Sequence, residues 1–308
     1  MNSPISRVIL SVLAGYVLIL LLLTARDWYR REYPRPPAES LVEERIQHPL
    51  HHKRALDALD RFGRLPRTER EAIRKNLEER LVPLEQWLSR LDRSDVQILC
   101  LGELHEESTR AFLADVLFAR IPVDVLLLEA TPRDLKGLMR RAESGRRYFP
   151  LLGADIMEIL RTVMAVNPGI RICGIEETAE QQKREHQTSG SRDQHIAQNF
   201  WEHFRPGLRH VVLFGAFHCA KEPNWLYGNL WKKANSELRK KMLNVRVAHE
   251  HQHGPLEAFL FFLDDLGLKN NSSLVLETDL LHPWLSDSFP VLCRHIFVKY
   301  KALLVFYS

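Results

Sequence analysis

Short apolar runs alternate with longer segments whose apolar residues recur at helical spacing, from about residue 97 to the end of the chain. The runs have the length of buried strands and cover residues 98–101, 124–128, 170–175, 210–214, 245–248, 274–276 and 303–306. The segments between them predict amphipathic helices over residues 108–120, 132–144, 154–166, 192–204, 225–243 and 256–266. This alternation predicts an α/β fold with a mainly parallel sheet between helices on both faces, a three-layer α/β/α arrangement.

An uncharged apolar run at residues 8–24 precedes this pattern. At about 1.5 Å per residue, a helix of this length crosses most of a roughly 30 Å hydrocarbon layer. We therefore expect an amino-terminal transmembrane helix, residues 1–25, in a single-pass membrane protein; a cleavable signal peptide is the main alternative. More arginines follow the run than precede it, and this charge count favours a cytoplasmic body.

Two further segments separate the apolar run from the first predicted strand. Residues 26–39 are rich in proline and predict a stiff juxtamembrane linker. Residues 40–95 carry apolar side chains at helical spacing among many Arg and Glu, which predicts an amphipathic helical lead-in with solvated charged faces. We expect this lead-in to pack on the main α/β domain, residues 96–308. Within that domain, the break at residues 148–150 could form a flap over a site.

Composition is that of a globular protein, with 308 residues, 45% hydrophobic and 27% charged. The net charge of +4 is a small difference between 43 basic and 39 acidic side chains, so nucleic-acid binding has little support. The four cysteines are far apart in the sequence, and no disulfide framework or zinc ribbon is expected.

Titratable side chains follow four of the predicted strands. They are Glu103 and His105, Glu129, Glu176 and Glu177, and His218. Because the carboxyl ends of parallel strands meet at one edge of a sheet, where open α/β proteins bind ligands, we expect these groups to converge. A strand also ends in polar residues simply because it emerges into solvent, and that interpretation stays open for Glu176 and Glu177.

Two imidazoles and two carboxylates around one pocket can activate water by metal coordination or by proton abstraction. In the leading hypothesis His105 is the general base or a metal ligand, and Glu129 orients it or shares its proton. His218 binds the metal or a developing oxyanion, and Arg192 fixes an anionic group of the substrate. A divalent transition metal would have Glu103, His105 and His218 as ligands. Alternatively, Arg192 only neutralises Glu103 or Glu129 in a salt bridge.

Four motifs resemble, in order and spacing, those of a superfamily that contains erythromycin esterases, ChaN-type haem-binding lipoproteins and Tiki-type metalloproteases. They are Gly-Glu-Leu-His at 102–105, Leu-Leu-Leu-Glu at 126–129, Arg-Asp-Gln-His-Ile-Ala at 192–197 and Phe-Gly-Ala-Phe-His at 214–218. The resemblance covers residues 97–308 and is closest in pattern to ChaN-like domains. It implies a site built from Glu103, His105, Glu129, Arg192 and His218, with Asp193 in support. Glu176, which follows a predicted strand, is a further candidate for a supporting role. The chain departs from the pattern at Ile196, where a methionine is common, and in lacking a lipoprotein cysteine.

The resemblance implies two kinds of function. The first is hydrolysis of an ester or amide in a small molecule or a peptide, as in the esterases and metalloproteases. The second is non-covalent haem binding for iron uptake without turnover, with a histidine or tyrosine as axial ligand. A membrane-tethered scaffold with a relic site is a third alternative. The family resemblance favours an extracytoplasmic body, in contrast to the charge count.

Other histidines stand outside the four motifs. His249, His251 and His253 cluster before Gly254-Pro255, but they do not form the His-Glu-x-x-His helix motif, and we expect a loop with adventitious metal affinity. His195 follows Arg192 by three residues, and it either lines the pocket or packs in the core. His48, His51 and His52 have no matching ligand partners and are expected at the surface.

Overall fold

A computed structural model of the chain describes residues 49–143, 154–185, 192–250, 254–269 and 273–307. Residues 50–308 form one compact unit. The expected transmembrane segment, the linker, His48, the break at 148–150, His251 and His253 lie outside the described residues. Among the helices that the structure describes, none is long and apolar enough to cross a membrane.

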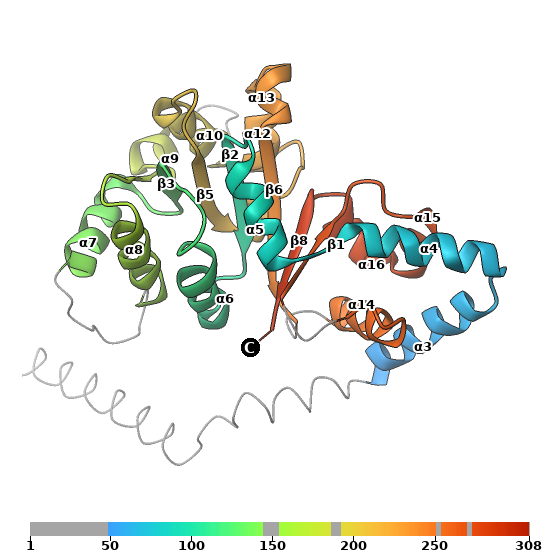
Figure 1. Cartoon of the computed structure of the whole chain (residues 1–308). Helices are drawn as coiled ribbons and strands as arrows, with labels where there is room; N and C mark the ends of the chain where they lie inside the picture. The colour runs from blue at the N-terminus through green and yellow to red at the C-terminus, as the bar shows by residue number, and fades with distance from the viewer. Residues whose placement is uncertain (1–48, 144–153, 186–191, 251–253, 270–272, 308) are drawn as a thin grey trace, which may run out of the picture. The chain divides into compact units, whose positions relative to one another are not determined.

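A mixed α/β architecture is built around one eight-stranded sheet with the order β1-β7-β8-β6-β2-β5-β3-β4 (Figure 1). The strands are β1 (Leu81–Pro83), β2 (Ile98–Glu103), β3 (Val125–Leu128), β4 (Arg171–Gly174), β5 (His210–Gly215), β6 (Met242–His249), β7 (Leu274–Glu277) and β8 (Ala302–Phe306). Every apolar run expected to be a strand is one, and the sheet is mostly parallel, as predicted. Only the pairs β1–β7 and β7–β8 are antiparallel within the described sheet.

The strand order places the expected site strands beside one another. β2 pairs with β5 in a register that aligns Glu103 with Gly215, and β5 pairs on its other side with β3, aligning Leu213 with Leu128. β3 in turn pairs with β4. All three ladders are parallel, so the carboxyl ends of β2, β5, β3 and β4 lie along one edge of the sheet. Residues that are more than a hundred positions apart in the sequence therefore become neighbours there.

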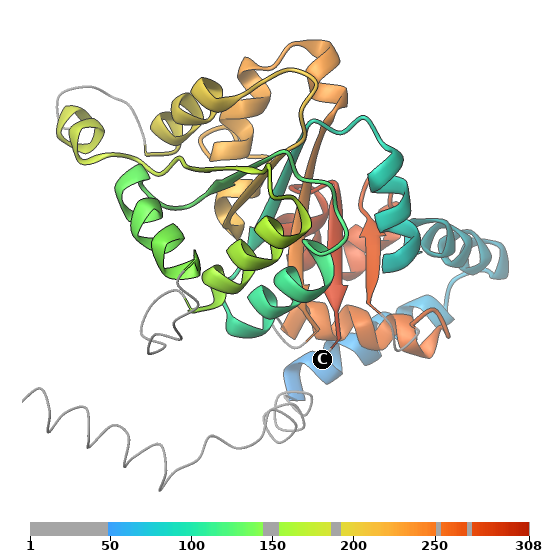
Figure 2. The ribbon, with the colours of Figure 1, turned by 60° about the vertical axis from the view of Figure 1, so that its left-hand side comes forward.

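Helices cover both faces of the sheet because successive strand side chains enter two different hydrophobic clusters. Ile98 and Cys100 join one cluster, and Leu99 and Leu101 join the other. The first cluster packs on α3 (Pro49–Gly63), α4 (Arg67–Arg80), α10 (Arg192–His203), α12 (Leu226–Lys233) and α14 (Gly254–Asp265). The second packs on α5 (Leu84–Arg93), α6 (Glu107–Phe112), α7 (Pro132–Glu143) and α8 (Ala154–Val166), some of which come forward in Figure 2.

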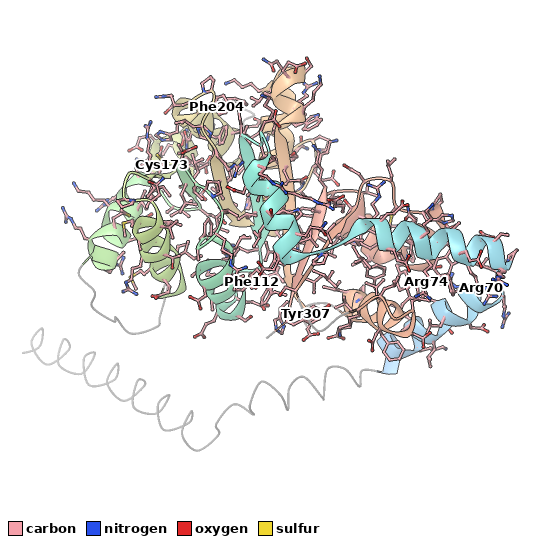
Figure 3. The ribbon with its side chains drawn as sticks, in the orientation of Figure 1. Arg70, Arg74, Phe112, Cys173, Phe204 and Tyr307 are labelled. Atoms are coloured by element: carbon pink, nitrogen blue, oxygen red, sulfur yellow. A yellow bond between two sulfur atoms is a disulfide. The ribbon has the colours of Figure 1, made fainter. Side chains whose placement is uncertain are left out.

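Aromatic packing and surface ion pairs follow the expected division between core and solvent. Phe112 at the end of α6 stacks on Phe306 of β8 with ring centroids 4.5 Å apart (Figure 3). Arg74 pairs with Glu78 at 2.9 Å along α4, where both side chains are about half exposed. The charged faces of the lead-in are thus solvated, and pairs of this kind contribute little to stability.

Two predicted regions differ from the structure, the helical lead-in and the helix expected over residues 225–243. β1, a three-residue strand in the helical lead-in, pairs with β7, and its length is too short for a periodicity signal. The prediction of one helix over 225–243 is wrong at its carboxyl end. The helix α12 ends at Lys233, a separate helix, α13 (Ser236–Lys240), follows, and β6 begins at Met242. Asn235 caps α13, since its side chain accepts a hydrogen bond from the Leu238 N–H at 2.8 Å.

A disulfide joins Cys100 in β2 to Cys219 in α11 (Ala216–Cys219). This pairing corrects the expectation that the cysteines form no disulfide. The two residues are 119 positions apart, and only the adjacency of β2 and β5 brings their Cα atoms to 5.7 Å. Gly102 allows α11 to lie this close, because a Cβ there would be 3.1 Å from both the Ala216 Cα and the Cys219 Cβ. The disulfide therefore anchors α11, which carries His218, to the strand that carries Glu103.

Reduction of this disulfide is expected to lower the free energy of unfolding by about 2–4 kcal/mol, because the cross-link restricts a long loop in the unfolded chain. The measurement is urea unfolding of wild type and of the double variant Cys100→Ala, Cys219→Ala, each with and without dithiothreitol. Dithiothreitol should destabilise the wild type and Cys293→Ala, a variant that keeps the disulfide, but not the double variant. Equal midpoints for wild type in the two conditions would refute the prediction.

Candidate functional site

Glu103 and His105 form the first wall of the site at the end of β2. The Glu103 side chain is only 2% exposed, whereas the His105 side chain is 44% exposed. His105 has a left-handed backbone conformation with φ of 55°, which is uncommon for a residue other than glycine and is often found at functional sites. The turn directs the His105 backbone N–H to Oε2 of Glu103 at 3.1 Å. The same turn brings the imidazole back over the strand end.

The His105 imidazole lies between two carboxylates. Its Nδ1 is 2.9 Å from Oε1 of Glu103, and its Nε2 is 3.4 Å from Oε2 of Glu129. The hydrogen bond with Glu103, followed by the one with Glu129, raises the pKa of His105 from 6.5 to about 9 despite the opposing effect of burial. Arg110 on α6 binds Glu103 at 3.0 Å and places a guanidinium nitrogen 2.8 Å from Nδ1 of His105. With this pKa the ring is mostly protonated at neutral pH and donates from Nδ1 to Glu103, so the Arg110 nitrogen near Nδ1 is a repulsive neighbour rather than a hydrogen-bond donor to it.

Glu129, at the end of β3, is held from three sides. The backbone N–H of Gly215 donates to its Oε2 at 2.9 Å, and Arg192 donates to its Oε1 at 2.8 Å. Burial alone would raise the pKa of Glu129, but its hydrogen bonds with His105, Gly215 and Arg192 together hold it well below the usual range. A Cβ at Gly215 would lie 2.9 Å from Nε2 of His105, so the absence of a side chain there makes room for the imidazole.

Arg192 is the first residue of α10 and connects three neighbours. It donates to Glu176 through Nε at 2.8 Å and Nη2 at 2.6 Å, a two-point contact that suits a guanidinium. Its other partners are Glu129 and Nε2 of His218, the latter at 3.0 Å from Nη1. Hydrogen bonds, first with Glu176 and then with Glu129, raise the pKa of Arg192 above its usual value. The salt bridge to Glu129 that the sequence left open is present, and Glu176 belongs to the site.

His218 and Asp193 form a hydrogen-bonded pair beneath Arg192. Oδ1 of Asp193 is 2.6 Å from Nδ1 of His218, and both side chains are nearly buried. A guanidinium can only donate, so its contact at Nε2 identifies that nitrogen as the acceptor and Nδ1 as the N–H that donates to Asp193. The rings of Phe214 and Trp225 meet the imidazole edge to face, with centroids 5.8 and 5.7 Å away. These contacts fix the ring plane and direct Nε2 into the cluster.

The structure brings together the predicted site residues at the strand edge. The contacts described above include Glu103, His105, Glu129, Glu176, Arg192, Asp193 and His218. Glu177 instead pairs with His195, 2.5 Å from Oε1 to Nδ1, in the buried interior. His249 ends β6 and packs on Phe306 with centroids 5.0 Å apart.

Sequence reasoning missed two contributors to this edge, Arg110 and the Gly215 amide. Arg110 follows Glu103 by seven residues on the helix after the strand, a spacing that is a weak signal on its own. The Gly215 amide contributes a backbone N–H, which any residue except proline has. The glycine itself indicates only that another group lies close to the backbone at this position.

A metal ion does not fit the cluster in this arrangement. Within the described ranges, no group of three or more His, Cys, Asp or Glu side chains is disposed to hold one. Nδ1 of His105 and Nδ1 of His218 each contact a carboxylate, as metal-ligating histidines also do, but Nε2 of His218 faces the cation Arg192, which a metal ion would have to displace. We therefore derive no step through a metal, and the ligand set Glu103, His105 and His218 stays a prediction.

Comparisons with known proteins give no family for the chain. No protein-family profile and no curated protein sequence matches it. A solved structure described as "Bacterial protein toxins" is 16% identical, covers 68% of this chain and 46% of its own, and has a TM-score of 0.35. The chain thus spans less than half of that neighbour, and a likeness this low carries no argument. The superfamily resemblance remains a prediction from the four motifs.

The raised pKa of His105 predicts a pH dependence of stability. Protonation of His105 stabilises the folded protein fully below pH 6.5, and this contribution is lost as the pH rises through about 9. The difference in melting temperature between wild type and His105→Asn should therefore shrink from pH 6 to pH 10. Asparagine is the matched replacement because it tolerates the left-handed backbone. A constant difference, or an imidazole that titrates near 6.5 by NMR, would contradict this.

Proposed function

We propose that the strand-edge cluster catalyses hydrolysis of an ester or amide by general acid–base chemistry. The observation that carries the proposal is the Asp193–His218 pair, whose 2.6 Å contact presents Nε2 of His218 to the cluster. A carboxylate behind an imidazole fixes its tautomer and stabilises the imidazolium that forms when the ring takes a proton. The four motifs in which the sequence resembles the superfamily contain Asp193 and His218, and this resemblance supports the same pair.

In this mechanism His218, rather than His105, is the general base. The pKa of His105, about 9, keeps that ring protonated at neutral pH and suits it to donate a proton. His218 accepts a hydrogen bond from Arg192 at Nε2, so its lone pair becomes available to water when substrate draws the guanidinium aside. This moves the role of general base, which the sequence suggested for His105, to His218, and makes His105 the general acid.

A side chain of the cluster assists each step of the hydrolysis. Nε2 of His218 takes a proton from water, whose oxygen forms the new bond to the carbonyl carbon. Arg192 stabilises the negative charge that develops on the carbonyl oxygen, because the guanidinium that moves away from Nε2 of His218 is 43% exposed and can donate to the substrate. His105 gives its proton to the leaving oxygen or nitrogen as the bond to the carbon breaks. The proton on His218 then passes to His105, directly or through solvent, which restores the resting state.

The compartment of this activity is also a proposal. Disulfides persist in oxidising compartments and are rare in the cytosol, so the Cys100–Cys219 pair supports an extracytoplasmic body. The superfamily resemblance points the same way, and the arginine count around residues 8–24 points the other way. We propose that the body is extracytoplasmic, tethered by the predicted membrane helix.

Substitution of the acid–base residues should abolish most of the turnover of p-nitrophenyl esters. His218→Gln and Asp193→Asn are each expected to lower kcat by on the order of 10²–10⁴-fold, the usual contribution of a positioned acid or base, and His105→Asn should do so for alkyl esters, whose leaving groups need a proton. His203→Gln is the matched control, because His203 lies on the same helix as Asp193 but at its opposite end.

The readouts are steady-state kinetics and melting curves for each variant. Lost turnover in three site variants that remain folded at the assay temperature, and normal turnover in His203→Gln, are the expected results. Wild-type turnover in His218→Gln would sink the base assignment. Stoichiometric haem uptake with a Soret band, in protein that hydrolyses none of the esters, would replace the hydrolase by the haem-binding alternative.

A further inference from the structure

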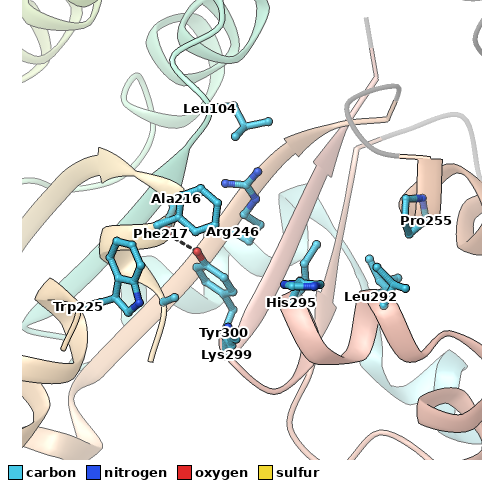
Figure 4. Close-up of a pocket in the computed structure, with 13 residues that line it drawn as sticks. Leu104, Ala216, Phe217, Trp225, Arg246, Pro255, Leu292, His295, Lys299 and Tyr300 are labelled. Carbon is cyan, nitrogen blue, oxygen red and sulfur yellow. Dashed lines mark hydrogen bonds between the residues drawn. The ribbon is translucent and has the colours of Figure 1, made fainter. Parts of the chain in front are cut away.

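A cavity of about 390 Å³ adjoins the cluster and has no role in the mechanism above (Figure 4). Its size is in the range of pockets that hold small organic molecules. Phe217 of α11 and Trp225 lie at one end in Figure 4, and Leu292 of α16 (Pro290–Leu292) lies at the other. Most of the lining is apolar, and the few polar groups in it decide which class of ligand the pocket suits.

Two polar side chains of the lining are bound to other parts of the protein. The Lys299 ammonium pairs with Glu222 at 2.8 Å, which compensates its charge. The Tyr300 hydroxyl donates a hydrogen bond to the carbonyl oxygen of Ala216. A ligand that needed either group as a partner would first have to break one of these contacts.

Arg246, the charged residue of the lining nearest the cluster, also has partners. It is buried, it interacts with other groups of the protein, and the carboxylates of Glu106 and Glu103 stabilise its charge. His295, the remaining titratable side chain of the lining, is exposed and stays hydrated. A charged ligand would therefore lose its hydration here without gaining a counter-ion, whereas an uncharged apolar group is stabilised by leaving water.

The order of the strands places the pocket beside one end of the cluster. Arg246 lies on β6 beside Gly102 of β2, and Leu104, which also lines the pocket, directly precedes His105. The strands β5, β3 and β4 follow on the other side of β2. His105 therefore belongs to the end of the cluster that adjoins the pocket.

Arg192 lies at the opposite end of the cluster. Its guanidinium binds Glu129 and Glu176, which follow β3 and β4. In the proposed mechanism the carbonyl oxygen of the substrate lies at this guanidinium, and the leaving oxygen lies at its proton donor, His105. A substrate oriented in this way extends its leaving group from His105 toward β6, and so into the pocket.

We propose that this pocket binds the uncharged, apolar alcohol portion of the substrate, so that the hydrolase acts on esters of long-chain alcohols. The inference rests on the proposed function for the position of the reacting bond, but binding of the free alcohol does not require turnover. His105 protonates the leaving oxygen as its bond to the carbonyl carbon breaks, and the alcohol that forms is neutral. An amine released from an amide would instead become charged at neutral pH, so the pocket favours esters over amides.

Photolabelling of the full chain with an aliphatic diazirine alcohol tests the pocket without any catalytic step. Illumination attaches the probe to side chains beside it, and peptide mapping locates the label. Val291→Trp places a large ring at the α16 end of the pocket, from a position that is 43% exposed and so tolerates the substitution. Val298→Trp is the matched control, since Val298 follows in the next turns of the chain, is 71% exposed and does not line the pocket.

In wild type, the peptide that carries Phe217 should be labelled, and excess 1-octanol should prevent this labelling. Val291→Trp should lower the labelling about tenfold, which is the effect of leaving roughly two CH₂ groups in water, and Val298→Trp should leave it unchanged. An unlabelled Phe217 peptide, or equal labelling in wild type and Val291→Trp, overturns the pocket even if esters are hydrolysed.

Two isomeric esters test the orientation of the substrate. Octyl acetate carries its long chain on the alcohol, and methyl nonanoate carries it on the acid. Wild type should have the higher kcat/KM for octyl acetate, and Val291→Trp should lower that value about tenfold while methyl acetate hydrolysis stays within about twofold. A preference for methyl nonanoate would place the acid in the pocket and overturn the proposal. Octanol-sensitive labelling that Val291→Trp weakens, in protein that hydrolyses none of the esters, upholds the pocket and defeats the proposed function.

Discussion

Four carboxylates share the carboxyl edge of this sheet, and their mutual repulsion has to be compensated for the edge to fold. Glu103 is almost completely buried, and Glu129, Glu176 and Asp193 are largely so. Removing such groups from water is unfavourable unless cations and hydrogen-bond donors replace the solvent. The compensating groups are Arg110, Arg192, the Gly215 amide and two imidazoles. The charge state of His105 and the tautomer of His218 are consequences of this requirement.

The backbone holds these groups at fixed distances. Parallel pairing of β2, β5, β3 and β4 sets the spacing of the strand ends, and the disulfide fixes α11 against β2. Arg192 enters from α10 and closes the arrangement over the top of β3 and β4. Because catalysis depends on groups held in place before the substrate arrives, this rigidity is what would allow a weak base such as an imidazole to act.

The amino-acid pattern predicts the strands of this fold well, because buried parallel strands are short continuous apolar runs bounded by helices. It also predicts the site residues, since a Glu or His at the end of such a strand lies at the carboxyl edge of the sheet once the strands are parallel. It misses β1 because three residues carry no periodicity, and it misses the Cys100–Cys219 pair because the residues meet only through the sheet. The amino-acid pattern does not predict the proposed roles of His105 and His218, for a different reason. Whether His105 is protonated depends on ångström-scale distances to Glu103 and Glu129, which residue types alone do not contain.

The tautomer of His218 tests the account most directly. In protein labelled with ¹⁵N-histidine, with the His218 resonances assigned by their loss in His218→Gln, the ring nitrogens report which one carries the proton. We predict that the neutral ring carries its proton on Nδ1, shared with Asp193, with a bare Nε2 directed at Arg192. A proton on Nε2, or a ring with no preference between the two nitrogens, would contradict it.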